Sequence, residues 1–201
     1  MSADSGHRLI ASDLKAALGD CQIGNQLDVV EEASSTNDLA WEAEKQGAAE
    51  GFVVFAERQS AGRGQYGRNW ESTAHQGLWF SVLLRPKLSL AESPQLTSQL
   101  AGAVARAIRE ETGCIPQVKP PNDIYVGGRK IAGVLVEGRT AADGSYVAVA
   151  GVGVNVNQTI EDFPQELRLT AGSLAMAAGR TVPRAQLAIS ILKKIENALA
   201  G

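Results

Sequence analysis

The sequence predicts an α+β fold in which a mixed, mainly antiparallel sheet packs against helices. Strand-like runs at residues 124–126 and 130–137 flank Gly127-Gly128, which is typical of a tight hairpin. Two long segments, beginning at Ser93 and near Pro183, repeat apolar residues every three to four positions, as amphipathic helices do. Hairpins combined with helices on one side of the sheet favour this class over a doubly wound parallel sheet.

The other elements follow from local patterns. Ser35, with Asp38 three residues later, predicts a capped helix that ends near Gly47. Ser93 is the expected N-cap of the longest helix, which Gly113 ends. That helix carries one unbroken apolar stripe, namely Leu96, Leu100, Val104 and Ile108. The remaining expected elements are a helix at 11–19, strands at 27–31, 52–57, 77–85 and 146–156, and a helix at 173–179.

Composition limits the class of protein. The chain has 201 residues, of which 44% are apolar and 20% charged, as in a single soluble globular domain. A net charge of -3 does not favour binding to DNA, and no apolar run is long enough to span a membrane. The first residues lack a secretory signal, and Cys21 and Cys114 lie far apart. The missing signal and two separated cysteines are typical of reduced thiols, so we expect a cytoplasmic protein. His7 and His75 form no metal motif, so we expect no metal site of its own.

A glycine-arginine loop follows the strand at 52–57. Its key residues are Gly62, Arg63, Gly64, Gly67 and Arg68. Glycines let the backbone approach a ligand closely, and arginines offer paired donors that suit phosphate or carboxylate. The spacing also matches a dinucleotide-binding fingerprint, but no helix follows it and Lys87 stands where an acidic residue is expected. An anion-binding loop and a plain surface loop remain as interpretations of these residues alone.

A second stretch, Lys119 to Gly138, reads KPPNDIYVGGRKIAGVLVEG. Together with Ser35-Thr36-Asn37, the glycine-arginine loop and the run at 151–155, it resembles the catalytic domain of the biotin protein ligase family. The four motifs occur in the family's order over about residues 30–160. The resemblance implies a class II aminoacyl-tRNA synthetase-like fold. It also implies ATP-dependent formation of biotinyl-5′-AMP, with Mg²⁺, and transfer of biotin to a lysine of a biotin carboxyl carrier protein.

The resemblance also implies roles for individual residues. Its biotin-binding positions are Ser35, Thr36, Asn37, Gln59, Gly62, Arg63, Gly64, Gln65 and Lys130. Its nucleotide contacts are Arg63, Arg68, Asn122 and Asn155, and Trp70 completes the loop motif. For Ser35 and Thr36 the alternative is a helix cap without any ligand.

Activating a carboxylate with ATP brings two anions together, so fixed positive charge is needed between them. We expect Lys130 to supply it, with Arg63 on the phosphate side. Asp123 is the candidate that orients or deprotonates the acceptor lysine in the second step. The alternatives are an exposed hairpin lysine at 130 and an Asn122-Asp123 pair that only caps a turn.

Several features bear on the range of functions. Pro120 stands where the family usually has tryptophan. We expect one catalytic domain over residues 1–201, with no winged helix before it and no small β-domain after it; a homodimer is one option. The rival functions are a lipoate-protein ligase or lipoyl transferase, and a non-catalytic biotin-binding module.

Overall fold

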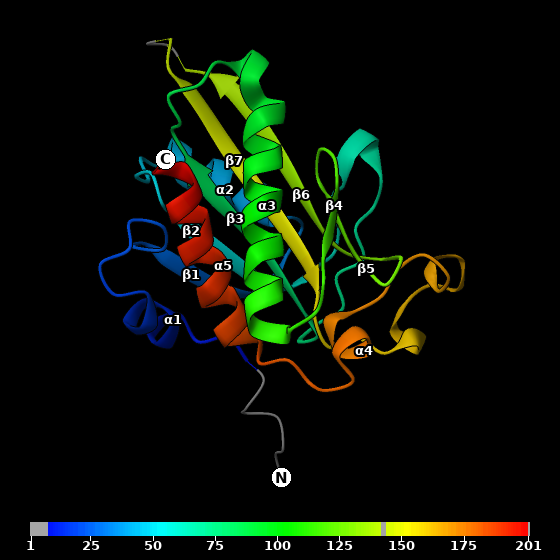
Figure 1. Cartoon of the computed structure of the whole chain (residues 1–201). Helices are drawn as coiled ribbons and strands as arrows, with labels where there is room; N and C mark the ends of the chain where they lie inside the picture. Colours follow the sequence, from blue (N-terminus) through cyan, green and yellow to red (C-terminus); the bar gives the residue numbers. More distant parts are fainter. Residues whose placement is uncertain (1–7, 142–143, 201) are drawn as a thin grey trace.

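The computed structural model of this chain describes residues 8–141 and 144–200. His7 and the other N-terminal residues considered for a secretory signal lie outside these ranges. Seven described strands form one sheet in the order β1-β2-β3-β7-β6-β5-β4 (Figure 1). Only β1 and β2 are parallel, and every other neighbouring pair is antiparallel. The strands are β1 Leu27–Ala33, β2 Val53–Gln59, β3 Gly77–Leu84, β4 Gln117–Lys119, β5 Asp123–Val126, β6 Arg129–Thr140 and β7 Tyr146–Asn155. The α+β prediction is therefore confirmed.

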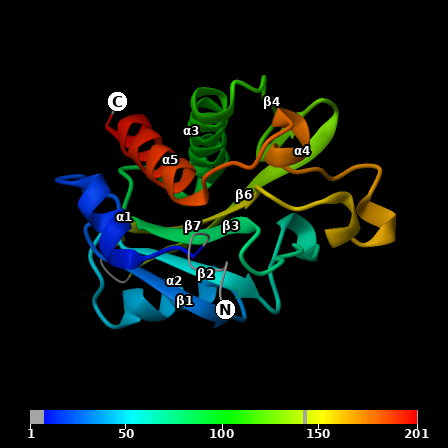
Figure 2. The ribbon, with the colours of Figure 1, turned by 90° about the horizontal axis from the view of Figure 1, so that it is seen from below.

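The helices cover both faces of this sheet. They are α1 Ala11–Leu18, α2 Thr36–Lys45, α3 Ser93–Thr112, α4 Leu174–Ala178 and α5 Arg184–Leu199. Figure 2 shows α3 and α5 on one face and α2 on the other. The expectation that the helices lie on one side is therefore wrong for α2. The reason is that β3 and β7 are apolar on both faces, and Leu83 and Val149 on the second face pack with Ala40 of α2.

The main core lies between the sheet and the α3–α5 layer. The predicted stripe of α3 is fully buried at all four positions, and α5 contributes Leu187, Ile191 and Ile195. The N-cap of α3 is Glu92 and not Ser93, because Ser89 and Glu92 form a capping box one turn earlier and carry the chain straight into the helix. Gly113 ends α3 at φ 74°, as expected.

The start of α2 also differs from the expectation. Ser35 occupies the N-cap position, but its side chain makes no capping hydrogen bond. Its partner in the predicted cap, Asp38, instead binds Arg63 of the glycine-arginine loop. Ser35 is buried at 3% exposure, as are Thr36 and Asn37 in the first turn of the helix. This leaves the first turn of α2 available to form the wall of a site.

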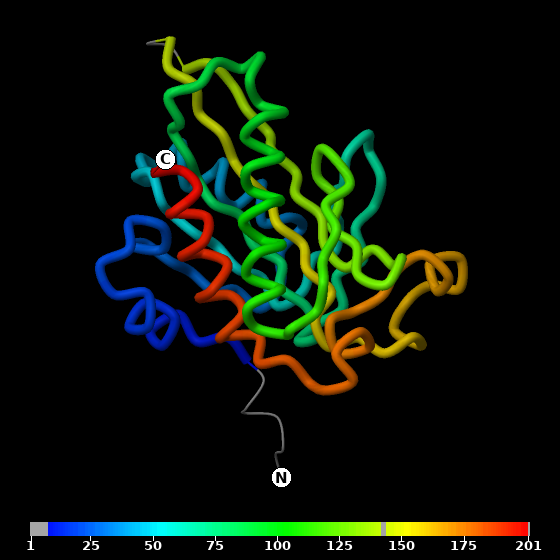
Figure 3. The backbone as a smooth tube through the Cα atoms, in the orientation of Figure 1, coloured from blue at the N-terminus to red at the C-terminus, as the bar shows by residue number. Residues whose placement is uncertain are grey.

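The β5–β6 hairpin turns at Gly127 and Gly128, both at positive φ as predicted. A segment distant in sequence, residues 160–172, runs beside this hairpin (Figure 3). Backbone hydrogen bonds join them: Lys130 N donates to Thr170 O, and Gly172 N donates to Lys130 O. The hairpin and this segment therefore form two walls of one region.

Candidate active site

The floor of the site is a row of glycines on the α2 face of the sheet. On that face β7 carries Val147 and Val149 beneath α2, then Gly151 beneath Asn37 in the first turn of the helix, and then Gly153 beneath Trp70. Gly153 pairs across the strands with Gly133 of β6. Because side chains alternate along a strand, replacing valine by glycine on one face opens space there without exposing the core on the other.

Trp70 fills part of this space. A Cβ on Gly153 would lie 2.5 Å from the Trp70 ring, so only glycine fits there unless the ring moves, and one on Gly133 would lie 3.1 Å from it, a tight contact that a small shift relieves. Trp70 also meets Trp79 edge-on, with ring centroids 6.3 Å apart. The indole therefore stands on the sheet as a partition between two neighbouring pockets.

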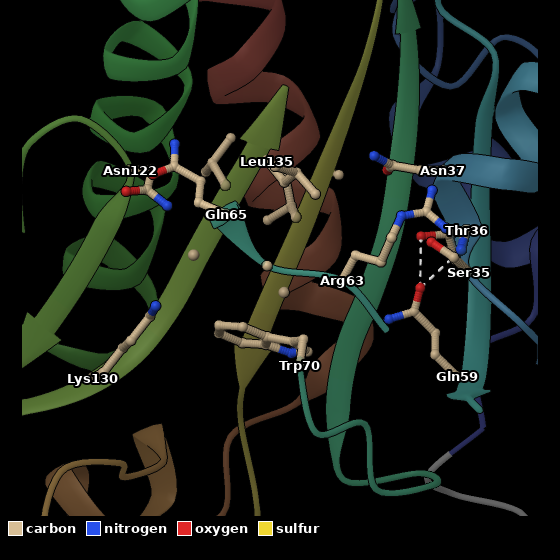
Figure 4. Close-up of a pocket in the computed structure, with 16 residues that line it drawn as sticks. Ser35, Thr36, Asn37, Gln59, Arg63, Gln65, Trp70, Asn122, Lys130 and Leu135 are labelled. Carbon is tan, nitrogen blue, oxygen red and sulfur yellow. Dashed lines mark hydrogen bonds between the residues drawn. The ribbon is translucent and has the colours of Figure 1, made fainter. Parts of the chain in front are cut away.

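The first pocket has a polar end built by α2 and β2 (Figure 4). Gln59 Oε1 accepts hydrogen bonds from the backbone N–H and the hydroxyl of Thr36, at 2.8 and 3.1 Å. Gln59 Nε2 donates to the Ser72 hydroxyl at 3.1 Å. Beneath them the fully buried Ser81 hydroxyl lies 2.8 Å from Thr36 Oγ1 and 2.6 Å from Asn37 Oδ1. These bonds fix the orientation of the polar end before any ligand binds.

Two buried donors at this pocket have no hydrogen-bond partner among the described residues. They are the side-chain amide nitrogen of Asn37 and the indole nitrogen of Trp70. Both residues line the first pocket. Since buried donors are nearly always satisfied in native proteins, these two groups indicate a ligand with acceptor oxygens or bound water.

The glycine-arginine loop crosses the first pocket, and ion pairs of Arg63 hold the loop in this position. Arg63 Nη1 and Nη2 donate to the two carboxylate oxygens of Asp38 at 2.9 and 2.7 Å. Glu137 Oε1 lies 3.4 Å from Arg63 Nε and Nη2. The hydrogen bonds that Arg63 donates to Asp38 hold the pKa of the Asp38 carboxyl below its usual value, and the same bonds raise the pKa of Arg63.

The second pocket lies across Trp70 and is the larger of the two. Its wall includes Asp123, whose carboxylate pairs with Lys130 Nζ at 2.7 Å. Lys130 Nζ also lies 5.2 Å from the centre of the Trp70 ring. The residues shared by both pockets are Gly64, Gln65, Trp70, Asn122 and Lys130. Lys130 is therefore a cation at the boundary between the pockets.

The far wall of the second pocket comes from the 160–172 segment, with Phe163 and Leu167 as its apolar members. Asn155 Nδ2 donates to Gly172 O at 2.9 Å, and Arg129 Nη1 donates to Ala171 O at 2.9 Å. These bonds hold the segment against β6 and β7. The pocket thus combines an apolar wall with cations at its edge, as a site for a flat, anionic ligand requires.

The structure brings most of the sequence-predicted residues to these two pockets. The first is lined by Ser35, Thr36, Asn37, Gln59, Arg63, Gly64, Gln65, Asn122 and Lys130, and the second also by Arg68, Asp123 and Asn155. Gly62 lines neither, but its carbonyl oxygen accepts a hydrogen bond from the backbone N–H of Trp70 at 2.9 Å. Pro120 is exposed and lines neither pocket, so the departure from tryptophan lies outside both walls. The Lys130 side chain is 29% exposed and paired, unlike a free hairpin lysine.

Sequence reasoning missed two groups of residues. It assigned no site role to Asp38 or Glu137, because carboxylates on a helix and a strand carry no pattern that reveals an arginine partner from elsewhere. It also missed the floor glycines, for which a signal existed: the Gly-Val-Gly spacing at 151–153 leaves one face of a strand bare.

No three His, Cys, Asp or Glu side chains in the described part of the chain are placed to hold a metal ion. No described helix is long and apolar enough to cross a membrane.

Comparison with known proteins gives consistent results. The family model described as the biotin/lipoate A/B protein ligase family matches residues 29–157. The bifunctional ligase/repressor BirA of Bacillus subtilis is 38% identical over 93% of this chain and 60% of its own length. The biotin–[acetyl-CoA-carboxylase] ligase of Mycobacterium tuberculosis is 35% identical over 85% of this chain and 63% of its own length. The chain thus spans about 60% of the length of these curated relatives.

Solved structures agree with the fold. The biotin protein ligase from Aquifex aeolicus, in complex with biotin and ATP, superposes with a TM-score of 0.74 at 32% identity, covering 87% of this chain and 70% of that chain. The biotin protein ligase from Leishmania major, in complex with biotinyl-5-AMP, gives a TM-score of 0.72 at 26% identity, covering 87% of this chain and 75% of that one.

Proposed function

This chain belongs to the biotin/lipoate A/B protein ligase family, and we propose that it is a biotin protein ligase. In the proposed reaction a biotin carboxylate oxygen attacks the α-phosphorus of ATP, pyrophosphate leaves, and biotinyl-5′-AMP forms. The amine of a carrier-protein lysine then attacks the acyl carbon, and AMP leaves. The observation that carries the proposal is the position of Lys130, a cation on the boundary between a polar pocket and a larger one.

The first pocket suits biotin. Its polar end, with Thr36, Asn37 and Gln59, offers donors and acceptors in fixed positions for a ureido ring. The unpaired amide nitrogen of Asn37 matches the acceptor that a ureido oxygen would provide. The bare glycine floor and the Trp70 ring then offer apolar contact to the rest of the molecule. Biotin placed in this direction has its carboxylate end toward Lys130 and the second pocket.

The second pocket suits the nucleotide. It combines Arg68 and Lys130 with the apolar wall of Phe163 and Leu167, as phosphates and a base would require. Mg²⁺ on the polyphosphate would neutralise the leaving pyrophosphate. Asn122 and Asn155, which also line this pocket, remain proposed nucleotide contacts.

Lys130 and Asp123 would divide the two steps between them. Lys130 would leave its ion pair with Asp123 to bind the carboxylate and the α-phosphate, which lowers the repulsion between two anions. Asp123 is then released to accept a hydrogen bond from the incoming lysine, and to take its proton. The 2.7 Å pair would thus keep each group in reach of its task.

Biotin-dependent exchange of labelled pyrophosphate into ATP tests the first step without a carrier. We expect exchange in the wild type and a loss of at least about 100-fold in Lys130→Ala, since fixed charge at the reacting centre is worth that much or more. Lys45→Ala is the matched control, because Lys45 is an exposed lysine on α2. Equal exchange by Lys130→Ala and wild type would contradict the assignment.

Transfer to a purified carrier domain tests the second step. Asp123→Ala should keep most exchange but lose transfer by about 100-fold, the usual contribution of a general base. If Asp123→Ala instead lost both steps equally, Asp123 would serve only to place Lys130. Mass spectrometry of the biotinylated carrier would identify the modified lysine.

The family model also covers lipoate enzymes, so a lipoate ligase is the second candidate. Lipoate-dependent exchange, with none from biotin, would favour it, whereas biotin binding without exchange would indicate a non-catalytic module. A cytoplasmic location and action without DNA fit the net charge of -3 and the two free cysteines. A homodimer stays a prediction that sedimentation can test.

A further inference from the structure

The Arg63 side chain, which lines the first pocket, is held by two carboxylates from different elements of the fold. Asp38, on the first turn of α2, takes both terminal nitrogens at 2.7 and 2.9 Å. Glu137, on β6, approaches Nε and Nη2 at 3.4 Å. The glycine-arginine loop is therefore tied through one side chain to a helix and to a strand.

Glu137 is itself held in place. The indole N–H of Trp41 donates to Glu137 Oε2 at 3.1 Å, and the Arg139 guanidinium lies over the Trp41 ring at 4.6 Å. The Glu137 side chain is 31% exposed, so it is not a freely rotating surface carboxylate. Trp41 thus holds one carboxylate oxygen of Glu137, and Arg63 approaches the other.

This arrangement leaves Arg63 with little to offer a substrate anion. One guanidinium faces two carboxylates, so the group as a whole carries a charge of about -1. The planar fork that could bind a phosphate is already occupied by Asp38. In Figure 4 the guanidinium also points toward Thr36 and Asn37, whereas Lys130 lies across Trp70 from it.

We infer that Asp38 and Glu137 are positioning residues that hold Arg63 as a latch, closing the glycine-arginine loop over the first pocket. The identity of the retained ligand, biotin, rests on the proposed function above. A glycine-rich segment is costly to order, so contacts that order it in advance slow the escape of whatever it covers. The latch acts on ligand retention, and Lys130 rather than Arg63 meets the reacting anions.

Limited proteolysis tests the latch without any ligand. Arg68 and Asn69 are exposed, but a protease cleaves an ordered loop slowly because the segment must first leave its folded conformation. Asp38→Asn should therefore be cut by trypsin at Arg68–Asn69 about fivefold faster than wild type, the upper range for a partly exposed ion pair. Asp38→Glu, which keeps the charge, should restore much of the protection. Glu42→Gln is the matched control, since among the described residues the Glu42 side chain pairs with Lys45 at the end of α2 and with Gln46 at its C-cap, and not with the loop. Equal cleavage of Asp38→Asn and wild type would overturn the inference.

Biotin release gives the second measurement. Asp38→Asn should release labelled biotin about fivefold faster, with exchange at saturating biotin within about twofold of wild type. Trp41→Phe, which keeps the ring under Arg139 but removes the N–H, should give a smaller change of about twofold. In an Arg63→Lys background, which lacks the fork, Asp38→Asn should add nothing.

A gain in nucleotide binding or in exchange on removing the Asp38 charge would refute the latch. If Asp38→Asn lowered the KM for ATP or raised exchange, Asp38 would be competing with the nucleotide for Arg63. Unchanged biotin release together with unchanged proteolysis would also overturn it. If the wild type bound no biotin, the proposed function would fail, while the trypsin comparison would still decide whether the latch exists.

Discussion

The close packing of Trp70 on Gly153 leads to the most specific prediction. In Gly153→Ala the new Cβ would lie 2.5 Å from Trp70 Cε2 and 2.7 Å from Nε1. Ordinary van der Waals contact begins at 3.4 Å, so the indole must move by about 1 Å or leave the sheet. Either movement displaces the partition between the two pockets, while the backbone of β7 needs no unusual φ to accept alanine.

The cost follows from these distances. Overpacking a fitted site destabilises by about 1–3 kcal/mol, which for a domain of this size lowers Tm by about 2–12 °C. Displacement of Trp70 by about 1 Å should also reduce exchange by about 100-fold. Gly133→Ala should behave more mildly, because its Cβ would lie 3.1 Å from the ring and a shift of tenths of an ångström relieves it.

Thermal unfolding and biotin-dependent exchange, measured on the same preparations, test this reasoning. Gly102→Ala is the matched control: its Cβ would meet only Arg106 Nη1 at 3.4 Å, and alanine favours the α3 helix by about 1 kcal/mol. We expect activity to fall in the order Gly102→Ala, Gly133→Ala, Gly153→Ala. A fully active Gly153→Ala would refute the role of Trp70 as a partition.

Two further predictions concern stability and the polar end. Arg184 donates to both Glu57 oxygens, at 2.7 and 3.1 Å; burial alone would raise the pKa of Glu57, but these bonds and the N–H of Leu9 hold it below its usual value. This stabilisation should therefore be present above about pH 4.3 and be lost as pH falls through the folded-state pKa. Urea unfolding should show that Glu57→Gln is about 3–5 kcal/mol less stable than wild type at pH 7. The free energy of unfolding of Glu57→Gln should also fall less than that of wild type as the pH is lowered, and an equal fall in both proteins would contradict this. Ser81→Ala should cost about 1–3 kcal/mol and raise the KM for biotin, because it removes the buried support of Thr36; an unchanged KM would show that the support is dispensable.

Much of the fold could be predicted because its signals are local. The α3 stripe, the hairpin at Gly127-Gly128 and the apolar run of β7 each depend on spacing that a few residues set by themselves. Besides the placement of α2 on the second face of the sheet, two errors arose at the start of α2 and of α3, where Ser35 and Ser93 matched a capping pattern. At α2, Asp38 binds Arg63 instead of taking part in the cap. At α3, a capping box at Ser89 starts the turn earlier than expected.

The sequence by itself determined which side chains could do the chemistry: a lysine, a nearby carboxylate, and a loop of glycines and arginines. Only the tertiary structure decided which charges meet. It paired Lys130 with Asp123 at 2.7 Å and turned Arg63 toward Asp38 and Glu137, whose positions lie 25 and 74 residues away along the chain. The physical reason is that a charge acts through distance in space, and the crossing of β6, α2 and the glycine-arginine loop sets those distances.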